Sequence, residues 1–357
     1  MAKKLLASVM AFALCLSVSA ADMVVKEKNG EDQKINVVDT SETFLRFKIL
    51  SDSTVELTDE SSCRGHKSIT IPEKVRIEGK VYTVTSIGYK AFYGCSSLTS
   101  INIPEGLTSI EYGAFSGCKS LTSIKIPEGV TSIGGSAFER CRSLTSINIP
   151  KSVTSIGYHA FEYCRSLTSI IIPDGVTSIG GSAFYGCDNL EPKLLIYDKG
   201  TKCYGWIGNK EKCTNVVIPE GVTSIGHSAF WECSSLTSIK IPEGVTNIGD
   251  WAFYGCDNLE PKLLIYDKGT KCYGWIGNKE KCTDVVIPKG MTSIGAGAFA
   301  ECSGLTSIKI PEGVTSIGES AFGGCSNLDI VIDNSEEKVE VGWDAFKNCK
   351  SVKWLKD

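Results

Sequence analysis

The sequence predicts a solenoid: a rod or shallow arc of about twelve stacked coils, each of 23 residues, rich in β-structure and closed by short helical or 3-10 turns. The pair Ala-Phe, followed by Cys three residues after the Phe, occurs ten times, and neighbouring copies are 23 or 24 residues apart except for two gaps of 46. The stretch from Asp188 to Gly221 also recurs, with few changes, from Asp257, 69 residues later, which is three periods. The repeated phenylalanines are Phe92, Phe115, Phe138, Phe161, Phe184, Phe230, Phe253, Phe299, Phe322 and Phe346.

Composition restricts the class of protein. The 357 residues are 42% hydrophobic and 22% charged, which is typical of a folded chain. The net charge of −4 argues against a nucleic-acid-binding protein, which usually carries a basic excess. Three histidines leave little material for histidine-based catalysis or for a histidine-rich metal site.

Residues 1–20 have the pattern of a secretory signal peptide. Lys3 and Lys4 precede an apolar run from Leu5 to Val18, and small residues follow at Ser19 and Ala20. The run is shorter than the roughly 20 apolar residues that span a bilayer, and no comparable run follows. We therefore expect an exported protein, secreted or held at the cell surface, with no transmembrane segment after signal removal.

Residues 21–83 break the period and are expected to form a β-rich cap over the open end of the solenoid. The segment alternates in character at Phe44–Ile49 and contains a predicted hairpin, Val75–Ile77 and Val81–Val84. The solenoid is expected over 84–350, with degenerate units near 190–213 and 259–282, and a C-terminal tail over 351–357. In the degenerate units, Trp206-Ile207 and Trp275-Ile276 stand where Ala-Phe is expected.

One unit, Leu121 to Ser143, illustrates how a coil is built. Leu121, Ile124 and Ile126 lie on an extended piece, Glu128-Gly129 is a turn, Val130–Ile133 is a second extended piece, and Ala137-Phe138 begins a short turn. The apolar set of one unit cannot form a core alone. Stacking places each side chain on its own copy about 4.8 Å away, so the repeated residues form continuous ladders.

The repeat resembles the leucine-rich repeat of the BspA-like class. The residues that carry the resemblance are Leu121-x-x-Ile124-x-Ile126-Pro127, Val130-Thr131-x-Ile133-Gly134, Ala137-Phe138 and Cys141, in a pattern that covers about three quarters of the chain. The resemblance implies a leucine-rich-repeat solenoid in a bacterial surface protein. It also implies adhesion to host matrix proteins or to other microbes.

Fifteen cysteines follow residue 20, and ten of them occupy one coil position, three residues after the Phe. A residue repeated at one coil position is expected to point inward, so we predict reduced, buried thiols there, although neighbouring coils would place some sulfurs within bonding range. Cys203/Cys213 and Cys272/Cys282 lie ten apart in the degenerate units, where a disulfide stays an open alternative.

No arrangement of residues predicts catalysis, a cofactor or a metal. The segment Gly295–Ala300 only superficially resembles a dinucleotide loop, because no Rossmann strand and helix flank it. There is no Cys-x-x-Cys for zinc, and His66, His159 and His227 occupy unlike positions, which predicts solvated histidines. We expect no enzyme; a cleft between the cap and the first coil would favour one.

Positions that vary between units are the candidates for binding, since invariant positions are explained by packing. One variable stripe lies on the first extended piece of each unit and includes Lys125, Lys240 and Lys309. A second flanks Ala-Phe and is aromatic; exposed aromatic residues are enriched at binding hot spots and suit stacking on sugar rings, although some could pack against neighbouring coils. The candidate partner-binding residues are Tyr89, Tyr112, Tyr158, Tyr185, Trp231, Trp251, Tyr254, Lys125, Lys240 and Lys309, and the wider aromatic stripe includes Tyr93 and Tyr163.

The sequence therefore predicts a secreted or cell-surface, non-enzymatic binding protein. Its expected partners are extracellular matrix or other cell-surface proteins, and possible glycans, with no nucleic acid. The alternative is a structural envelope scaffold without a specific ligand.

Overall fold

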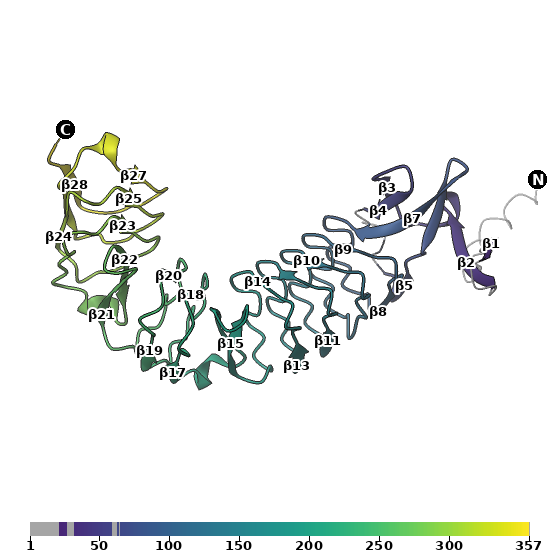
Figure 1. The fold of residues 1–357 in the computed structure, drawn as a ribbon, viewed down its shortest axis with the longest axis horizontal. Helices are drawn as coiled ribbons and strands as arrows, with labels where there is room; N and C mark the ends of the chain where they lie inside the picture. The colour runs from purple at the N-terminus through teal and green to yellow at the C-terminus, as the bar shows by residue number, and fades with distance from the viewer. Residues whose placement is uncertain (1–20, 27–31, 59–62, 64, 357) are drawn as a thin grey trace, which may run out of the picture.

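The protein is a curved solenoid in which successive coils stack in register (Figure 1). The computed structural model describes residues 21–26, 32–58, 63 and 65–356, so the predicted signal peptide lies outside the described residues. The described part contains strands, turns and single 3-10 turns, and the predicted repeat solenoid is confirmed. None of these helical turns has the length or apolarity needed to cross a membrane.

The second extended piece of each coil forms a two-residue strand on the concave side of the arc (Figure 1). Ile133 of β10 lies opposite Ile110 of β9 and Ile156 of β12, in parallel pairing, because the coils are in register. These strands are β9 (Ser109–Ile110), β10 (Ser132–Ile133), β12 (Ser155–Ile156), β14 (Ser178–Ile179), β18 (Ser224–Ile225), β20 (Asn247–Ile248), β23 (Ser293–Ile294), β25 (Ser316–Ile317) and β27 (Glu340–Val341).

The first extended piece forms the strands of the convex side (Figure 1). Their central isoleucines point inward, while the residues on either side face solvent, as β alternation requires. The last of these strands pairs with the one before it, so the chain is still in the sheet at Trp354. The strands are β5 (Ser68–Thr70), β8 (Ser100–Asn102), β11 (Ser146–Asn148), β13 (Ser169–Ile171), β17 (Asn215–Val217), β19 (Ser238–Lys240), β24 (Ser307–Ile310), β26 (Asp329–Ile332) and β28 (Ser351–Trp354).

The phenylalanines of the Ala-Phe turns stack on their copies, and all are buried except Phe346 in the last turn, which is partly buried. The ring of Phe138 lies 5.3 Å from that of Phe115 and 5.4 Å from that of Phe161, with nearly parallel planes. The Phe138 amide donates to the Ala160 carbonyl of the next coil at 2.8 Å. Each ladder is therefore continuous in both its side chains and its backbone, as the 23-residue period predicts.

The N-terminal segment is rich in β-structure and runs directly into the first coil. β7 (Lys80–Ile87) pairs with the cap strand β6 over its first half and with the cap strand β4 over its second half, and its end also pairs with β9 of the solenoid. The other cap elements are β1 (Ala21–Lys26), β2 (Asp32–Asp39), the 3-10 turn η1 (Thr40–Glu42), β3 (Phe47–Ile49), β4 (Thr54–Leu57) and β6 (Lys74–Ile77).

A disulfide joins Cys63 of the cap to Cys95, the first cysteine of the ladder. The prediction of reduced thiols is therefore wrong for Cys95. Cys63 comes from the segment without period and lies beside the first coil, where the ladder has no preceding cysteine. The bond closes a loop of 32 residues, which stabilises the folded state by about 3–4 kcal/mol in the chain-entropy account.

Each degenerate unit is an antiparallel hairpin followed by a 3-10 turn. The first consists of β15 (Lys193–Tyr197), β16 (Lys202–Ile207) and η3 (Lys210–Lys212), and the second of β21 (Lys262–Tyr266), β22 (Lys271–Ile276) and η4 (Lys279–Lys281). The two degenerate units divide the buried side chains of the solenoid into three hydrophobic clusters. A last 3-10 turn, η5 (Glu336–Lys338), precedes β27.

The solenoid changes direction at these hairpins (Figure 1). The concave sheet is interrupted between β14 and β16 and again between β20 and β22. Side chains replace the backbone ladder at the first interruption: Lys202 and the Tyr204 hydroxyl both donate to the Thr177 carbonyl. We call the two places the first bend and the second bend.

Candidate binding surface

The first bend brings together two coils that are not neighbours in sequence. The Trp206 amide donates to the Ala229 carbonyl at 2.9 Å, the hydrogen bond that the phenylalanine amide makes in a regular coil. The period aligns Ile207 and not Trp206 with the phenylalanine, so the hairpin is shifted by one residue from the repeat. The hairpin has no Ala-Phe turn to hold the coils before and after it apart. The Tyr185 hydroxyl consequently donates to Glu232, 47 residues away.

A basin of about 480 Å³ opens at this bend, and we call it the bend basin. Its walls combine aromatic rings, two carboxylates, two histidines and two hydroxyls. Tyr158, which is 57% exposed, stands at its edge and meets the ring of His227 edge-on at 5.9 Å. The lining residues are His159, Glu162, Tyr163, Ser182, Tyr185, His227, Ser228, Trp231, Glu232 and Trp251.

The charged groups of the bend basin are paired within the protein. His159 Nδ1 lies 3.1 Å from Glu162, and this hydrogen bond raises the pKa of His159. The hydrogen bond to Glu232 likewise raises the pKa of Tyr185, so its hydroxyl stays protonated. Lys210 donates to the Trp231 carbonyl and lies 4.6 Å from the Tyr185 ring centre. The two carboxylates that line the bend basin are therefore both hydrogen-bonded, Glu162 to an imidazole and Glu232 to a neutral hydroxyl.

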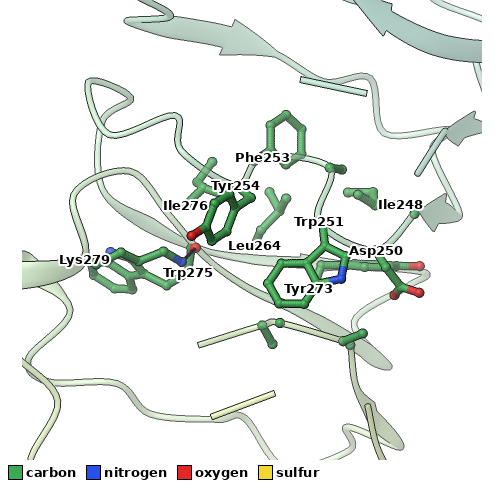
Figure 2. A pocket seen from close by; sticks show the side chains of 16 residues that line it. Ile248, Asp250, Trp251, Phe253, Tyr254, Leu264, Tyr273, Trp275, Ile276 and Lys279 are labelled. Carbon is green, nitrogen blue, oxygen red and sulfur yellow. Dashed lines mark hydrogen bonds between the residues drawn. The ribbon is translucent and has the colours of Figure 1, made fainter. Parts of the chain in front are cut away.

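The second bend has the same backbone plan with different side chains above it. Tyr254 donates to Glu301 at 3.2 Å, again across 47 residues. Both bends have a small crevice between hairpin and coil, of about 30 Å³ at the first bend and about 40 Å³ at the second. In Figure 2 the ring of Tyr254 lies between Trp251 and Lys279. Trp251 also lies over Gly297, where an added Cβ would come within 2.5 Å of its ring. The Trp251 side chain thus fills the second bend and forms a wall of the first.

A second group of aromatic residues lies in the first two coils, and we call Tyr89, Tyr93 and Tyr112 the tyrosine cluster. Their side chains are 60%, 55% and 48% exposed. Tyr89 stacks on Tyr112 with ring centres 5.7 Å apart, and Lys90 lies 5.0 Å from the Tyr89 ring and 5.2 Å from the Tyr93 ring. Exposed aromatic side chains beside a flexible cation are typical of protein-binding hot spots.

The three candidate lysines lie on the convex side, away from the concave strands that lead into the aromatic turns. Lys125 pairs with Glu105 at 2.6 Å, and Lys309 pairs with Asp333 at 3.1 Å. In the described part of the chain, Lys240 makes no ion pair. These lysines are exposed and occupy the same repeat position in three coils that are not neighbours, and two of the three already have a carboxylate partner.

The structure thus divides the predicted aromatic stripe into two groups. Tyr89 and Tyr112 belong to the tyrosine cluster, Tyr158, Tyr185, Trp231 and Trp251 surround the bend basin, and Tyr254 stacks on Trp231 with ring centres 4.4 Å apart. Sequence reasoning did not assign a role to Glu162, Glu232, His159, His227, Ser182 or Ser228. The sequence signal that could have located these residues is the missing Ala-Phe turn. Without this turn, the coils before and after the hairpin come together, and the lining residues belong to those coils.

In 21–26, 32–58, 63 and 65–356, no group of three or more His, Cys, Asp or Glu side chains could hold a metal ion. His66 stacks on Phe44, and His227 contacts its own neighbour Ser228 at 2.9 Å. Cys203, Cys213, Cys272 and Cys282 are free thiols, so neither alternative disulfide of the degenerate units is formed.

Thiol counting tests this cysteine assignment. We expect thirteen thiols to react with a disulfide reagent when the unreduced mature chain is unfolded, and two more after reduction. In the native chain only Cys349 should react quickly, since the other thiols are buried and burial raises the pKa of Cys118 and Cys203 to about 12. Fifteen thiols without reduction would contradict the Cys63–Cys95 bond.

A family model described as the BspA-type leucine-rich repeat region, in six copies, matches residues 61–191, 206–267 and 275–356. No match was found among curated proteins.

Several solved structures are similar to this chain. A leucine-rich repeat protein from Bacteroides ovatus ATCC 8483 is 25% identical, covers 88% of this chain and 99% of its own, and has a TM-score of 0.52. A leucine-rich cell surface protein from Faecalibacterium prausnitzii A2-165 is 27% identical, with coverages of 85% and 96% and a TM-score of 0.47. The pneumococcal vaccine antigen PcpA is 18% identical, with coverages of 94% and 88% and a TM-score of 0.49.

Proposed function

The chain belongs to the BspA-type leucine-rich repeat family, and we propose that it is an exported, non-enzymatic binding protein that acts at the cell surface or after secretion. Its partners in this proposal are host extracellular matrix proteins or the surface proteins of other cells. Proteins of this repeat fold are typically binding or scaffold proteins rather than enzymes, which supports the proposal.

The tyrosine cluster is the observation that carries it. Three exposed aromatic side chains within two coils cost solubility and are not needed for the core, whose phenylalanines are fully buried. Tyrosine buries a large area at low conformational cost, and Lys90 adds a charge that a partner carboxylate can meet. A scaffold without a ligand gains nothing from this arrangement.

Adhesion of the purified mature chain to immobilised collagen, laminin and fibronectin, and to whole cells, tests the proposal. We expect replacement of Tyr89, Tyr93 and Tyr112 together by alanine to weaken adhesion at least about tenfold, the effect of losing one hot spot. The effect on stability should be small because all three side chains are mostly exposed.

The matched control is the triple replacement of Lys125, Lys240 and Lys309 by alanine on the convex side. We expect a smaller loss, since two of these lysines are already paired and surface ion pairs contribute little. No adhesion to any surface by the unmodified chain would favour the scaffold alternative. A larger loss in the lysine variant would move the binding surface to the convex side.

A further inference from the structure

We propose that the bend basin is a carbohydrate-binding site for an uncharged oligosaccharide. The proposal rests on the proposed function, because it names the chemistry that one part of the binding surface would recognise. The bend basin lies away from the tyrosine cluster, so the two can be tested separately.

The first argument is the chemistry of the walls. Trp231, Trp251, Tyr163 and Tyr185 offer ring faces on which the apolar face of a pyranose can stack. Between the rings stand carboxylates, imidazoles and hydroxyls, which together accept and donate the hydrogen bonds of a polyol. The volume of about 480 Å³ falls within the roughly 300–1,000 Å³ of ligand pockets.

The second argument is charge, which separates a sugar from an ionic ligand. Two of the four aromatic walls, Tyr163 and Tyr185, already have cations of the protein beside them. Lys210 lies 4.6 Å from the Tyr185 ring centre, and Arg140 and Arg165 lie 5.9 Å and 5.6 Å from that of Tyr163. An anion would meet the two carboxylates, Glu162 and Glu232. A neutral ligand avoids both conflicts and can share the hydrogen bonds that these groups now make.

The third argument is backbone conformation. Six of the ten lining residues have φ between 55° and 57°, a left-handed conformation that favours glycine. They are His159, Tyr163, Ser182, Ser228, Glu232 and Trp251. Glycine stands at the position of Tyr163 in five other coils, and at that of Trp251 in two. The same two positions have a positive φ in all ten Ala-Phe turns, so the conformation belongs to the repeat. What is particular to the bend basin is that bulky and charged side chains from several turns gather at these positions.

The fourth argument comes from the duplication. The hairpin stretch is almost unchanged between the two bends, whereas eight of the ten residues that line the bend basin differ 69 positions later. Tyr185 and Glu232 recur as Tyr254 and Glu301. The scaffold is therefore shared, and the other side chains that form the bend basin are particular to the first bend. The changes from the first bend to the second are His159 to Ser228, Glu162 to Trp231, Tyr163 to Glu232, Ser182 to Trp251, His227 to Ala296, Ser228 to Gly297, Trp231 to Ala300 and Trp251 to Ser320.

This comparison supplies a blocking variant. Ser182 and Trp251 are equivalent positions with φ of 56° and 57°, so the second bend already shows that the backbone accepts tryptophan there. Trp251 lies over Gly297, and the first bend has Ser228 at that position, so Ser182→Trp is made in a chain that also carries Ser228→Gly. It should then fill the bend basin as Trp251 fills the second bend. Trp231→Ala removes a stacking face instead. Trp343→Ala is its matched control, since it also removes one tryptophan, which is 74% exposed and lies outside both the bend basin and the tyrosine cluster.

The experiment screens the mature chain against immobilised neutral oligosaccharides (gluco-, galacto-, manno- and N-acetylglucosamine tetramers), with sialylated glycans, a lysine-rich peptide and choline as charged probes. The strongest neutral probe is then titrated while tryptophan fluorescence is followed. We expect Ser182→Trp in the Ser228→Gly background, and Trp231→Ala, to weaken its binding at least tenfold. Ser228→Gly by itself and Trp343→Ala should weaken it much less. Binding of a neutral tetramer that survives Ser182→Trp overturns the site, as does binding of charged probes only or of none.

Oligosaccharide binding and adhesion to proteins are measured separately, so the two proposals can fail independently. Oligosaccharide binding without adhesion to matrix proteins would retain the bend basin and reject the protein partners. Adhesion that depends on the tyrosine cluster, without oligosaccharide binding, would do the reverse.

Discussion

Replacing Phe138 by alanine is expected to unfold the N-terminal part of the solenoid at a lower denaturant concentration than the rest. The ring is fully buried and stacks between Phe115 and Phe161 at 5.3 Å and 5.4 Å. Removing a buried phenylalanine costs about 3–5 kcal/mol, because transfer energy is lost and a cavity remains. In a solenoid each coil contacts only its neighbours, so the loss should stay local.

The distribution of tryptophan makes this measurable. All six tryptophans lie at position 206 or later, whereas Phe138 belongs to the hydrophobic cluster that ends at Ile207. Circular dichroism follows the whole chain, and tryptophan fluorescence follows only its C-terminal part. We expect the Phe138→Ala variant to show an early transition by circular dichroism that fluorescence does not detect.

Phe322→Ala is the matched control, because Phe322 is equally buried and stacks between Phe299 and Phe346. Its early transition should appear by both methods, since Trp343 and Trp354 lie in the same part of the chain. Coincident transitions in both variants would instead mean that the three hydrophobic clusters unfold as one unit.

The structure of a single coil can be predicted from the sequence because every regular coil makes the same contacts with its neighbours. A side chain that recurs every 23 residues must lie on its own copy if the coils stack, so Phe138, Ile133 and Cys141 could all be placed inward before the structure was known. The aromatic residues that flank Ala-Phe were predicted to face outward for the complementary reason, that variation between units excludes a role in the ladder.

The parts that break the period could not be predicted in the same way. The unit that contains the β15–β16 hairpin has the same number of residues as a regular coil. Its length therefore does not predict which coils come into contact across the hairpin. The contact between Tyr185 and Glu232 depends on the absence of one turn, and the Cys63–Cys95 bond depends on how the cap meets the first coil. The bend basin arises from such a break.

Gly205→Ala is expected to be the most damaging substitution at the first bend. Gly205 has a φ of 104°, and an added Cβ would lie 1.8 Å from the Ala229 carbonyl oxygen. The atom it meets is backbone, which cannot rotate away, so the hairpin must separate from the next coil. We expect the free energy of unfolding to fall by about 4 kcal/mol or more, which would place Gly205→Ala among the exceptional single substitutions. The Tyr185–Glu232 contact should be lost as well. Denaturation followed by tryptophan fluorescence measures it.

Gly200→Ala in the same hairpin separates the two causes of that loss. Gly200 also has a positive φ, 83°, but nothing lies within 4 Å of an added Cβ. Only the conformational cost applies there, about 1–2 kcal/mol. Gly274 repeats the test at the second bend, where an added Cβ would lie 2.0 Å from the Ala298 carbonyl oxygen. Similar losses for Gly200→Ala and Gly205→Ala would mean that the close approach of hairpin and coil does not hold the bend. A much larger loss at Gly205 and Gly274 would locate the curvature of the solenoid in these two backbone contacts.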